Sequence, residues 1–119
     1  MEIRFENKVA FITGAAGGIG YAAARMFAEA GASVVMADLD SRVTDRAKEL
    51  EAEGHNAIGI RCDVSDEAQV KAAVEKAVAV FGKLDIAYNN VGIHAAVRED
   101  LAETEGWDFD RVISVNLRG

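Results

Sequence analysis

The chain has 119 residues, of which 50% are hydrophobic and 28% charged, so it is long enough to bury one core as a globular domain. Its net charge of −7 argues against a nucleic-acid partner, and the absence of a long apolar run or signal-peptide pattern argues against a membrane partner. The single cysteine, Cys62, leaves no internal disulfide or cysteine-rich metal site, so we expect a cytoplasmic protein with no bound metal.

Short β-rich runs alternate along the chain with helical patterns. The predicted strands are Lys8 to Thr13, Ser33 to Ala37, Asn56 to Arg61 and Leu84 to Tyr88. Four helices are predicted. The first begins after the glycine-rich segment Gly14 to Gly18, and the second spans Ser41 to Glu53. The third follows Ser65 as its N-cap, and the fourth runs from near Thr104 up to Gly119. This alternation predicts an α/β fold with right-handed βαβ units. We expect one Rossmann-like, doubly wound parallel sheet over residues 1–119, with strand order 3-2-1-4 and no second domain.

Apolar residues at helical spacing predict the inner face of each helix. In the first helix they are Ile19, Ala22, Ala23, Met26, Phe27 and Ala30. In the second they are Val43, Ala47 and Leu50, and in the third Val70, Ala73, Val74, Ala77, Val78 and Phe81.

The segment Thr13 to Gly20, T-G-A-A-G-G-I-G, lies where the first strand becomes the first helix. Gly14 permits a tight turn, Gly17 and Gly18 let a pyrophosphate approach the backbone, and Gly20 lets the helix pack closely on the sheet. The phosphates would then lie at the helix N-terminus, where unpaired N–H groups point outward. The alternative is a glycine-rich turn that binds no ligand.

Asp38 follows the second strand, about 20 residues after the glycine turn, where an acid binds the adenosine ribose hydroxyls. A carboxylate there repels the 2′-phosphate of NADP. No Arg or Lys lies in the glycine turn, and Leu39 follows the acid, so the sequence favours NAD. The alternative is a solvated acid at a strand end, which we expect Asp40 to be.

Polar residues also follow the third and fourth strands. Asp63 is placed to accept a hydrogen bond from the adenine amino group and Val64 to pack on the ring, although a strand-end aspartate is also a common cap. Asn89 and Asn90 need partners for their amides, and they either tie neighbouring strands together or contact the ribose.

These motifs occur in the same order as in the short-chain dehydrogenase/reductase family, which the chain resembles from about Lys8 to Gly119. The matching residues are Thr13-Gly14-x-x-x-Gly18-Ile19-Gly20, Asp38, Cys62-Asp63-Val64, Asn89-Asn90-Val91-Gly92 and Val115-Asn116-Leu117. Val91 departs from the alanine that is usual at its position in the family. With the resemblance, the residues expected to bind the cofactor are Thr13, Gly14, Gly17, Gly18, Ile19, Gly20, Asp38, Asp63, Val64, Asn90 and Gly92.

The resemblance implies hydride transfer between NAD and an alcohol or carbonyl substrate. It also implies a catalytic role for Asn116, which would lie in a helix and support a water molecule of the proton relay. The partners of this asparagine in the relay would be a serine and a Tyr-x-x-x-Lys motif. That motif is absent from the sequence, because Tyr21 is followed at the fourth position by Arg25 and Tyr88 by Gly92. We therefore expect the cofactor-binding half of an enzyme, inactive alone.

Two classes of function remain open at this point. One is an NAD-dependent oxidoreductase that forms a homo-oligomer when complete. The other is a free-standing dinucleotide-binding or regulatory module without catalytic activity. In either case the fourth strand is expected to be an exposed sheet edge that recruits other chains.

Overall fold

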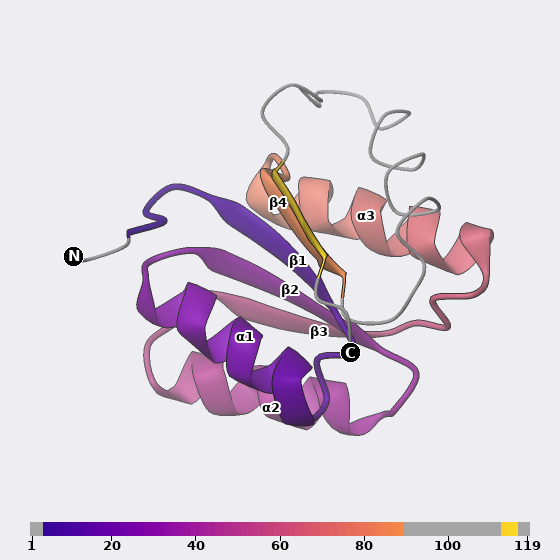
Figure 1. The fold of residues 1–119 in the computed structure, drawn as a ribbon, viewed down its shortest axis with the longest axis horizontal. Helices are drawn as coiled ribbons and strands as arrows, with labels where there is room; N and C mark the ends of the chain where they lie inside the picture. Colours follow the sequence, from indigo (N-terminus) through magenta and orange to yellow (C-terminus); the bar gives the residue numbers. More distant parts are fainter. Residues whose placement is uncertain (1–3, 90–112, 117–119) are drawn as a thin grey trace.

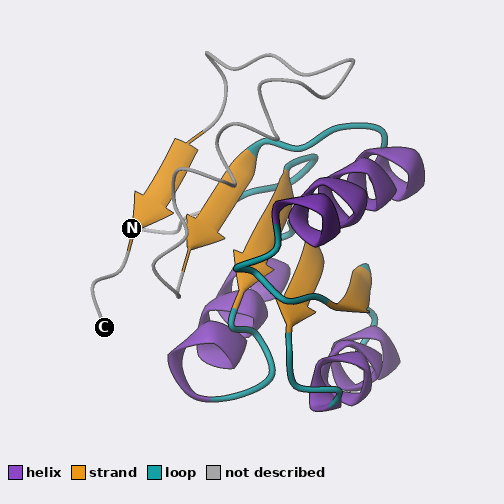
Figure 2. Ribbon diagram, turned by 90° about the vertical axis from the view of Figure 1, so that its right-hand side faces the viewer, coloured by secondary structure: helices purple, strands orange, loops and turns teal. Residues whose placement is uncertain are grey.

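A computed structural model describes residues 4–89 and 113–116 of the chain. The strands are β1 Val9–Thr13, β2 Ser33–Asp38, β3 Ala57–Arg61, β4 Ile86–Asn89 and β5 Ile113–Asn116. The helices are α1 Gly18–Glu29, α2 Arg42–Ala52 and α3 Glu67–Phe81. All strand pairs are parallel and the order is β3-β2-β1-β4-β5, which confirms the predicted doubly wound sheet (Figure 2).

Helices cover both faces of the sheet, so the strands are apolar on both sides (Figure 1). One core cluster packs under α1 and α2 and includes Ile12, Phe27, Met36 and Leu50. A second packs under α3 and includes Phe11, Val35, Val70 and Val74. The predicted inner faces of α2 and α3 are confirmed, because Val43, Ala47, Leu50, Val70, Ala73, Val74 and Ala77 are buried. Val78 and Phe81 pack against the cluster under α3.

The inner face of α1 differs from the prediction. Ile19 and Met26 are 56% and 58% exposed, whereas Gly20, Ala24 and Ala28 are buried with Ala23 and Phe27. Apolar residues occur on both the buried and the exposed side of α1, so apolar spacing alone does not fix which side faces the sheet. The small buried residues let α1 lie close to the strands.

The third helix begins one residue later than predicted. Asp66 is its N-cap, and the carboxylate accepts hydrogen bonds from the amides of Ala68 and Gln69. The Ser65 hydroxyl donates instead to Asp63. A carboxylate also complements the positive end of the helix dipole, which favours aspartate over serine as the cap.

The prediction of a helix running from near Thr104 to Gly119 is wrong for Ile113–Asn116, which forms β5. The sequence I-S-V-N alternates apolar and polar residues and contains two β-branched residues, a pattern that suits a strand. β5 pairs with β4 from Ile86↔Ile113 to Asn89↔Asn116, so β4 is not the exposed edge that we expected. The rest of the predicted helix lies outside the described residues.

Candidate functional site

The carboxyl ends of the parallel strands meet at one edge of the sheet. The register places Thr13 beside Ala37, Asp38 beside Arg61, and Asn89 beside Asn116. The chain runs from β1 outward to β2 and β3, and then returns to the other side of β1 as β4. Such a reversal of strand order is where doubly wound sheets bind ligands, and the glycine-rich turn leaves β1 at this point.

The glycine-rich turn has the backbone geometry that its sequence predicts. Gly14 and Gly18 have φ values of 64° and 60°, in the left-handed region that disfavours other residues. A Cβ at Gly20 would lie 1.8 Å from the Gly14 carbonyl oxygen, so only glycine allows α1 to pack against the turn. Gly17 is the N-cap of α1, and no side chain caps the helix.

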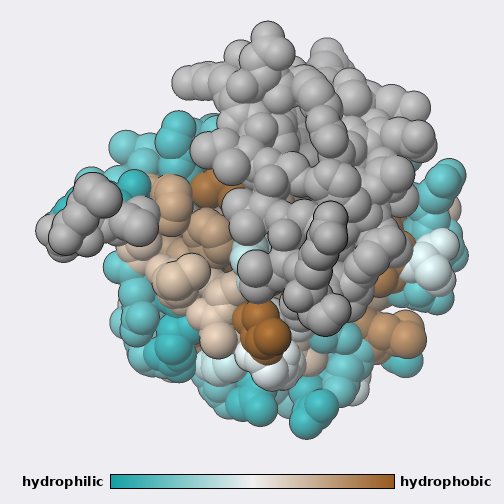
Figure 3. Space-filling view, viewed as in Figure 1, coloured by the Kyte–Doolittle hydropathy of each residue, from teal (hydrophilic) through white to brown (hydrophobic). Residues whose placement is uncertain are grey.

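The outer side of the turn is open. A Cβ built at Gly17 or at Gly18 meets no atom within 4 Å. Ile19, in the first turn of α1, is largely exposed, and apolar side chains gather over α1 on the surface in Figure 3. The turn therefore combines a close-packed inner side with an accessible outer side, which suits a group that lies against backbone N–H groups.

Asp38 binds the turn directly. Its Oδ2 accepts a hydrogen bond from the Ala16 amide at 2.9 Å, and its Oδ1 accepts one from the Asp40 amide at 2.9 Å. The Ala15 amide also donates to the Ala37 carbonyl oxygen at 3.2 Å, so the turn is fixed to the end of β2. Asp38 is thus a structural partner of the glycine turn and more than a solvated acid at a strand end.

Asp40 is partly exposed to solvent, as expected, and it also forms an ion pair. It holds Arg42 through two side-chain bonds of 2.7 and 2.9 Å, and the Arg42 guanidinium lowers the pKa of the Asp40 carboxyl. Arg46, one turn further along α2, donates from Nε to the Ala16 carbonyl oxygen at 3.1 Å. Neither arginine was predicted as part of the site, although Arg42 and Arg46 lie four and eight residues after Asp38, one helical turn apart.

Asp63 and Val64 follow β3 at the same edge. The Asp63 Oδ1 accepts from the Ser65 amide at 3.0 Å and from the Ser65 hydroxyl at 2.6 Å, and these bonds lower its pKa. This is the strand-end cap that we held as the alternative. Val64 packs against the core cluster under α3, and its contact with an adenine ring stays a prediction.

The remaining predicted residues divide into two groups. Thr13 is buried at the end of β1. The backbone of Asn116 lies opposite Asn89 in the sheet rather than in a helix, so the chain segments around Asn89 and Asn116 pair as the strands β4 and β5. Asn90 and Gly92 lie outside the described residues. The catalytic role of Asn116 stays a prediction.

The two tyrosines, Tyr21 and Tyr88, lie in different surroundings. The Tyr21 hydroxyl lies between α1 and α2, where it donates to Glu49 at 2.9 Å and accepts from Arg25 at 3.0 Å. Tyr88 is buried in β4, and burial raises its pKa. Within residues 4–89 and 113–116, no group of His, Cys, Asp or Glu is arranged to hold a metal ion.

A parallel sheet with a glycine-rich turn after β1 and an acid at the end of β2 defines a fold of the Rossmann type. Residues 8–119 match the family described as short chain dehydrogenase, and the chain belongs to that family. None of the helices in the described ranges is long and apolar enough to cross a membrane.

Relatives and solved structures agree with this assignment. The chain is 46% identical to the mitochondrial borneol dehydrogenase of Lavandula x intermedia, over 98% of the chain and 43% of that protein. It is 44% identical to the cis-4-hydroxycyclohexanecarboxylate dehydrogenase of Sinomonas cyclohexanicum, over 97% of the chain and 46% of that protein. The chain therefore spans less than half the length of these curated relatives.

Two crystal structures show the same arrangement. A hydroxysteroid dehydrogenase from Escherichia coli matches with a TM-score of 0.80 and 30% identity, over 85% of this chain and 51% of that one. A short-chain dehydrogenase/reductase from Burkholderia phymatum, in complex with NAD, matches with a TM-score of 0.69 and 40% identity, over 72% of this chain and 31% of that one.

Proposed function

We propose that this chain is the cofactor-binding part of an NAD-dependent oxidoreductase that acts on an alcohol or carbonyl substrate. The observation that carries the proposal is the direct bond between Asp38 and the glycine turn at the reversal point of the sheet. This contact joins the residue type that binds ribose to the segment type that binds pyrophosphate, as one preformed unit. Membership of the short-chain dehydrogenase family and the NAD complex of one structural neighbour support it.

The residues proposed to hold the cofactor have distinct tasks. The turn from Gly14 to Gly18 and the start of α1 would receive the pyrophosphate, and Asp38 would accept from the ribose hydroxyls. Thr13, Ile19, Asp63, Val64, Asn90 and Gly92 would line the rest of the site. When bound, NAD supplies the hydride acceptor, and the protein supplies binding and orientation.

The preference for NAD over NADP rests on the charge around Asp38. A carboxylate at the ribose repels a 2′-phosphate. The two arginines of α2 would attract one, but Arg42 is held by Asp40 and Arg46 by Glu49 and Ala16. Because both guanidinium groups have partners already, the acid dominates the choice in this proposal.

The class of substrate and the catalytic step are part of the same proposal, and they rest on the family resemblance. The family resemblance assigns catalysis to Asn116 together with a serine and a Tyr-x-x-x-Lys motif that the 119 residues do not contain. We therefore propose that these residues alone bind NAD without transferring hydride, and that the complete enzyme is a cytoplasmic homo-oligomer.

The test is equilibrium binding of NAD and NADP to the purified chain by calorimetry, followed by an assay of NAD reduction with a panel of secondary alcohols. We expect NAD to bind and NADP to bind at least tenfold more weakly, a difference of about 1.4 kcal/mol. We expect no turnover by the 119 residues alone. Failure to bind either dinucleotide overturns the proposal, and equal affinity for both overturns the assignment of Asp38.

A further inference from the structure

Arg46 lies on α2, and it contacts the glycine-rich turn that follows β1. Its Nε donates to the Ala16 carbonyl oxygen at 3.1 Å, while the Ala16 amide donates to Asp38 at 2.9 Å. The backbone of Ala16 is thus held from two sides, by the end of β2 and by α2. Arg46 lies 30 residues from Ala16 in the sequence and Asp38 lies 22 residues from it. The Arg46 bond therefore depends on the packing of α2 beside the turn, and the Asp38 bond depends on the place of β2 beside β1.

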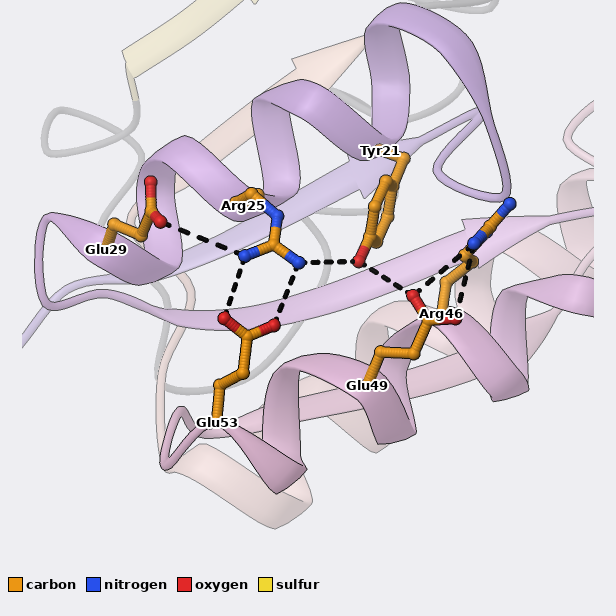
Figure 4. Close-up of polar contacts among 6 residues, drawn as sticks. All are labelled: Tyr21, Arg25, Glu29, Arg46, Glu49 and Glu53. Atoms are coloured by element: carbon orange, nitrogen blue, oxygen red, sulfur yellow. Dashed lines mark hydrogen bonds and ion pairs between the residues drawn. The ribbon is translucent and has the colours of Figure 1, made fainter.

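The position of Arg46 is itself fixed by neighbours, as Figure 4 shows. Its guanidinium carbon lies 5.0 Å from the centroid of the Tyr21 ring, and its Nη1 lies 3.2 Å from Oε1 of Glu49. The Tyr21 hydroxyl donates to the same Glu49 at 2.9 Å. A guanidinium held over a ring and beside a carboxylate keeps its Nε–H in one direction.

Arg25 offers a natural comparison on the other side of Tyr21. Its guanidinium carbon lies 5.6 Å from the ring centroid, and it binds Glu53 through two bonds of 2.8 and 2.9 Å. It also approaches Glu29 at 3.8 Å. These partners lie on α1 or directly after α2, and none belongs to the glycine-rich turn. Arg25 therefore links the two helices as Arg46 does, but it makes no bond to Ala16 like that of Arg46.

We propose that Arg46 is a positioning residue that sets the orientation of the pyrophosphate-binding turn. The Ala16 carbonyl and the Gly17 N–H share one planar trans peptide group, so holding the oxygen on Arg46 directs the N–H the opposite way. Gly17 and Gly18 follow each other with open space beside both, and glycine pairs have wide conformational freedom. Fixing this peptide before the ligand arrives removes part of the ordering cost of binding.

This inference rests on the proposed function, because it gives the turn a diphosphate to receive. It predicts that Arg46→Ala weakens the affinity for ADP about three- to tenfold, the effect of one hydrogen bond, while the affinity for adenosine changes less than twofold. Arg25→Ala is the matched control. It removes the same charge and the same kind of contact with Tyr21, and it should leave the affinity for ADP within twofold of wild type.

The experiment measures the dissociation constants of ADP and adenosine by calorimetry for wild type and both variants. Hydrogen exchange in the peptide covering Gly14 to Gly20, without ligand, gives an independent readout. Arg46→Ala should speed exchange there, and Arg25→Ala should not. If Arg46→Ala does not fold, Arg46→Lys replaces it, because a methylene then stands where the Nε–H was while the charge is kept.

The outcomes separate the two proposals. If wild type binds ADP and both alanine variants lose the same affinity, or neither loses any, Arg46 has no special role and the NAD-binding proposal stands. Full ADP affinity in Arg46→Lys also overturns the role of the Nε bond. If wild type binds neither ADP nor NAD, the proposed function fails and this inference fails with it.

Discussion

The Asp38 carboxylate lies 2.9 Å from the Ala16 amide nitrogen, so the acid proposed to bind the ribose also shapes the turn proposed to bind the pyrophosphate. One oxygen holds the turn and the other holds the Asp40 amide. A carboxylate oxygen has two lone pairs, so each still has capacity to accept from a hydroxyl. Selectivity and turn geometry are therefore coupled through one side chain.

Two substitutions of Asp38 separate these roles. Asp38→Ala removes the acceptor for both amides, so we expect weaker NAD binding, relaxed exclusion of NADP, and a loss of about 1–3 kcal/mol in unfolding free energy for the unpaired donors. Asp38→Asn removes the charge but keeps one acceptor oxygen, so exclusion of NADP should relax with a smaller loss of stability. Calorimetric titration with both dinucleotides and urea denaturation measure these effects. An unchanged ratio of the two affinities in both variants would contradict the assignment.

Gly20 and Gly17 are expected to tolerate alanine very differently. At Gly20 the new Cβ would overlap the Gly14 carbonyl oxygen at 1.8 Å, and the contact is with backbone that cannot move aside cheaply. We expect Gly20→Ala to lower the unfolding free energy by about 3 kcal/mol, as severe overpacking does. Urea denaturation checks this, and stability equal to wild type would show that α1 does not pack against the turn in this way.

Gly17→Ala tests the ligand side of the same turn. Gly17 has φ of −166°, which any residue adopts, and its Cβ would meet no atom within 4 Å. Stability should therefore stay within about 0.5 kcal/mol of wild type. If a pyrophosphate lies against this backbone, the added methyl group should weaken ADP binding. Unaltered ADP affinity would place the phosphates elsewhere.

The sheet and the glycine turn could be predicted from the sequence because their signals are local. A glycine-rich segment between a strand and a helix, and an acid after the next strand, need no knowledge of distant contacts. The Arg46 bond to Ala16 could not be predicted in the same way, because it exists only when α2 packs beside the turn. The prediction of the buried side of α1 failed for a different reason, since the large apolar residues Ile19 and Met26 lie on its exposed side.

The C-terminal segment shows the limit of both sequence pattern and resemblance as guides to local structure. The helical pattern from near Thr104 and the family likeness both predicted a helix around Asn116, whereas the alternation of Ile113 to Asn116 suits a strand, and the backbone pairs with β4 there. Pairing with β4 gives the backbone of these four residues partners in the parallel sheet. A short segment beside an open parallel strand therefore follows its tertiary surroundings.

The N-cap of α3 gives a test of local stability. The Asp66 carboxylate accepts from the amides of Ala68 and Gln69, which lack partners within the helix. Asp66→Ala should cost about 0.5–2 kcal/mol of unfolding free energy. Ser65→Ala serves as the control, because the Ser65 hydroxyl bonds Asp63 rather than the helix, and it should cost less. Equal losses in the two variants, measured by urea denaturation, would show that Asp66 is not the main cap.

Cys62 makes stability depend on pH in the alkaline range. The thiol is 1% exposed, and burial, with Asp63 and Asp66 nearby, raises its pKa from 9.0 to about 11. The folded state therefore favours the neutral thiol, while the Cys62 thiol of the unfolded chain ionises near pH 9.0. The resulting stabilisation is fully present below pH 9.0 and is lost as the pH rises towards 11.

We therefore expect the unfolding free energy to fall more steeply between pH 9.0 and 11 in wild type than in Cys62→Ala. Urea denaturation at both ends of this range measures the two slopes. All other ionisable groups are the same in the two proteins, so their effect on the slope cancels when the slopes are compared. The cavity left by the shorter side chain lowers the unfolding free energy at every pH, so it does not change the slope. Parallel slopes would mean that the thiol ionises equally in the folded and unfolded chains, which its burial at the end of β3 argues against.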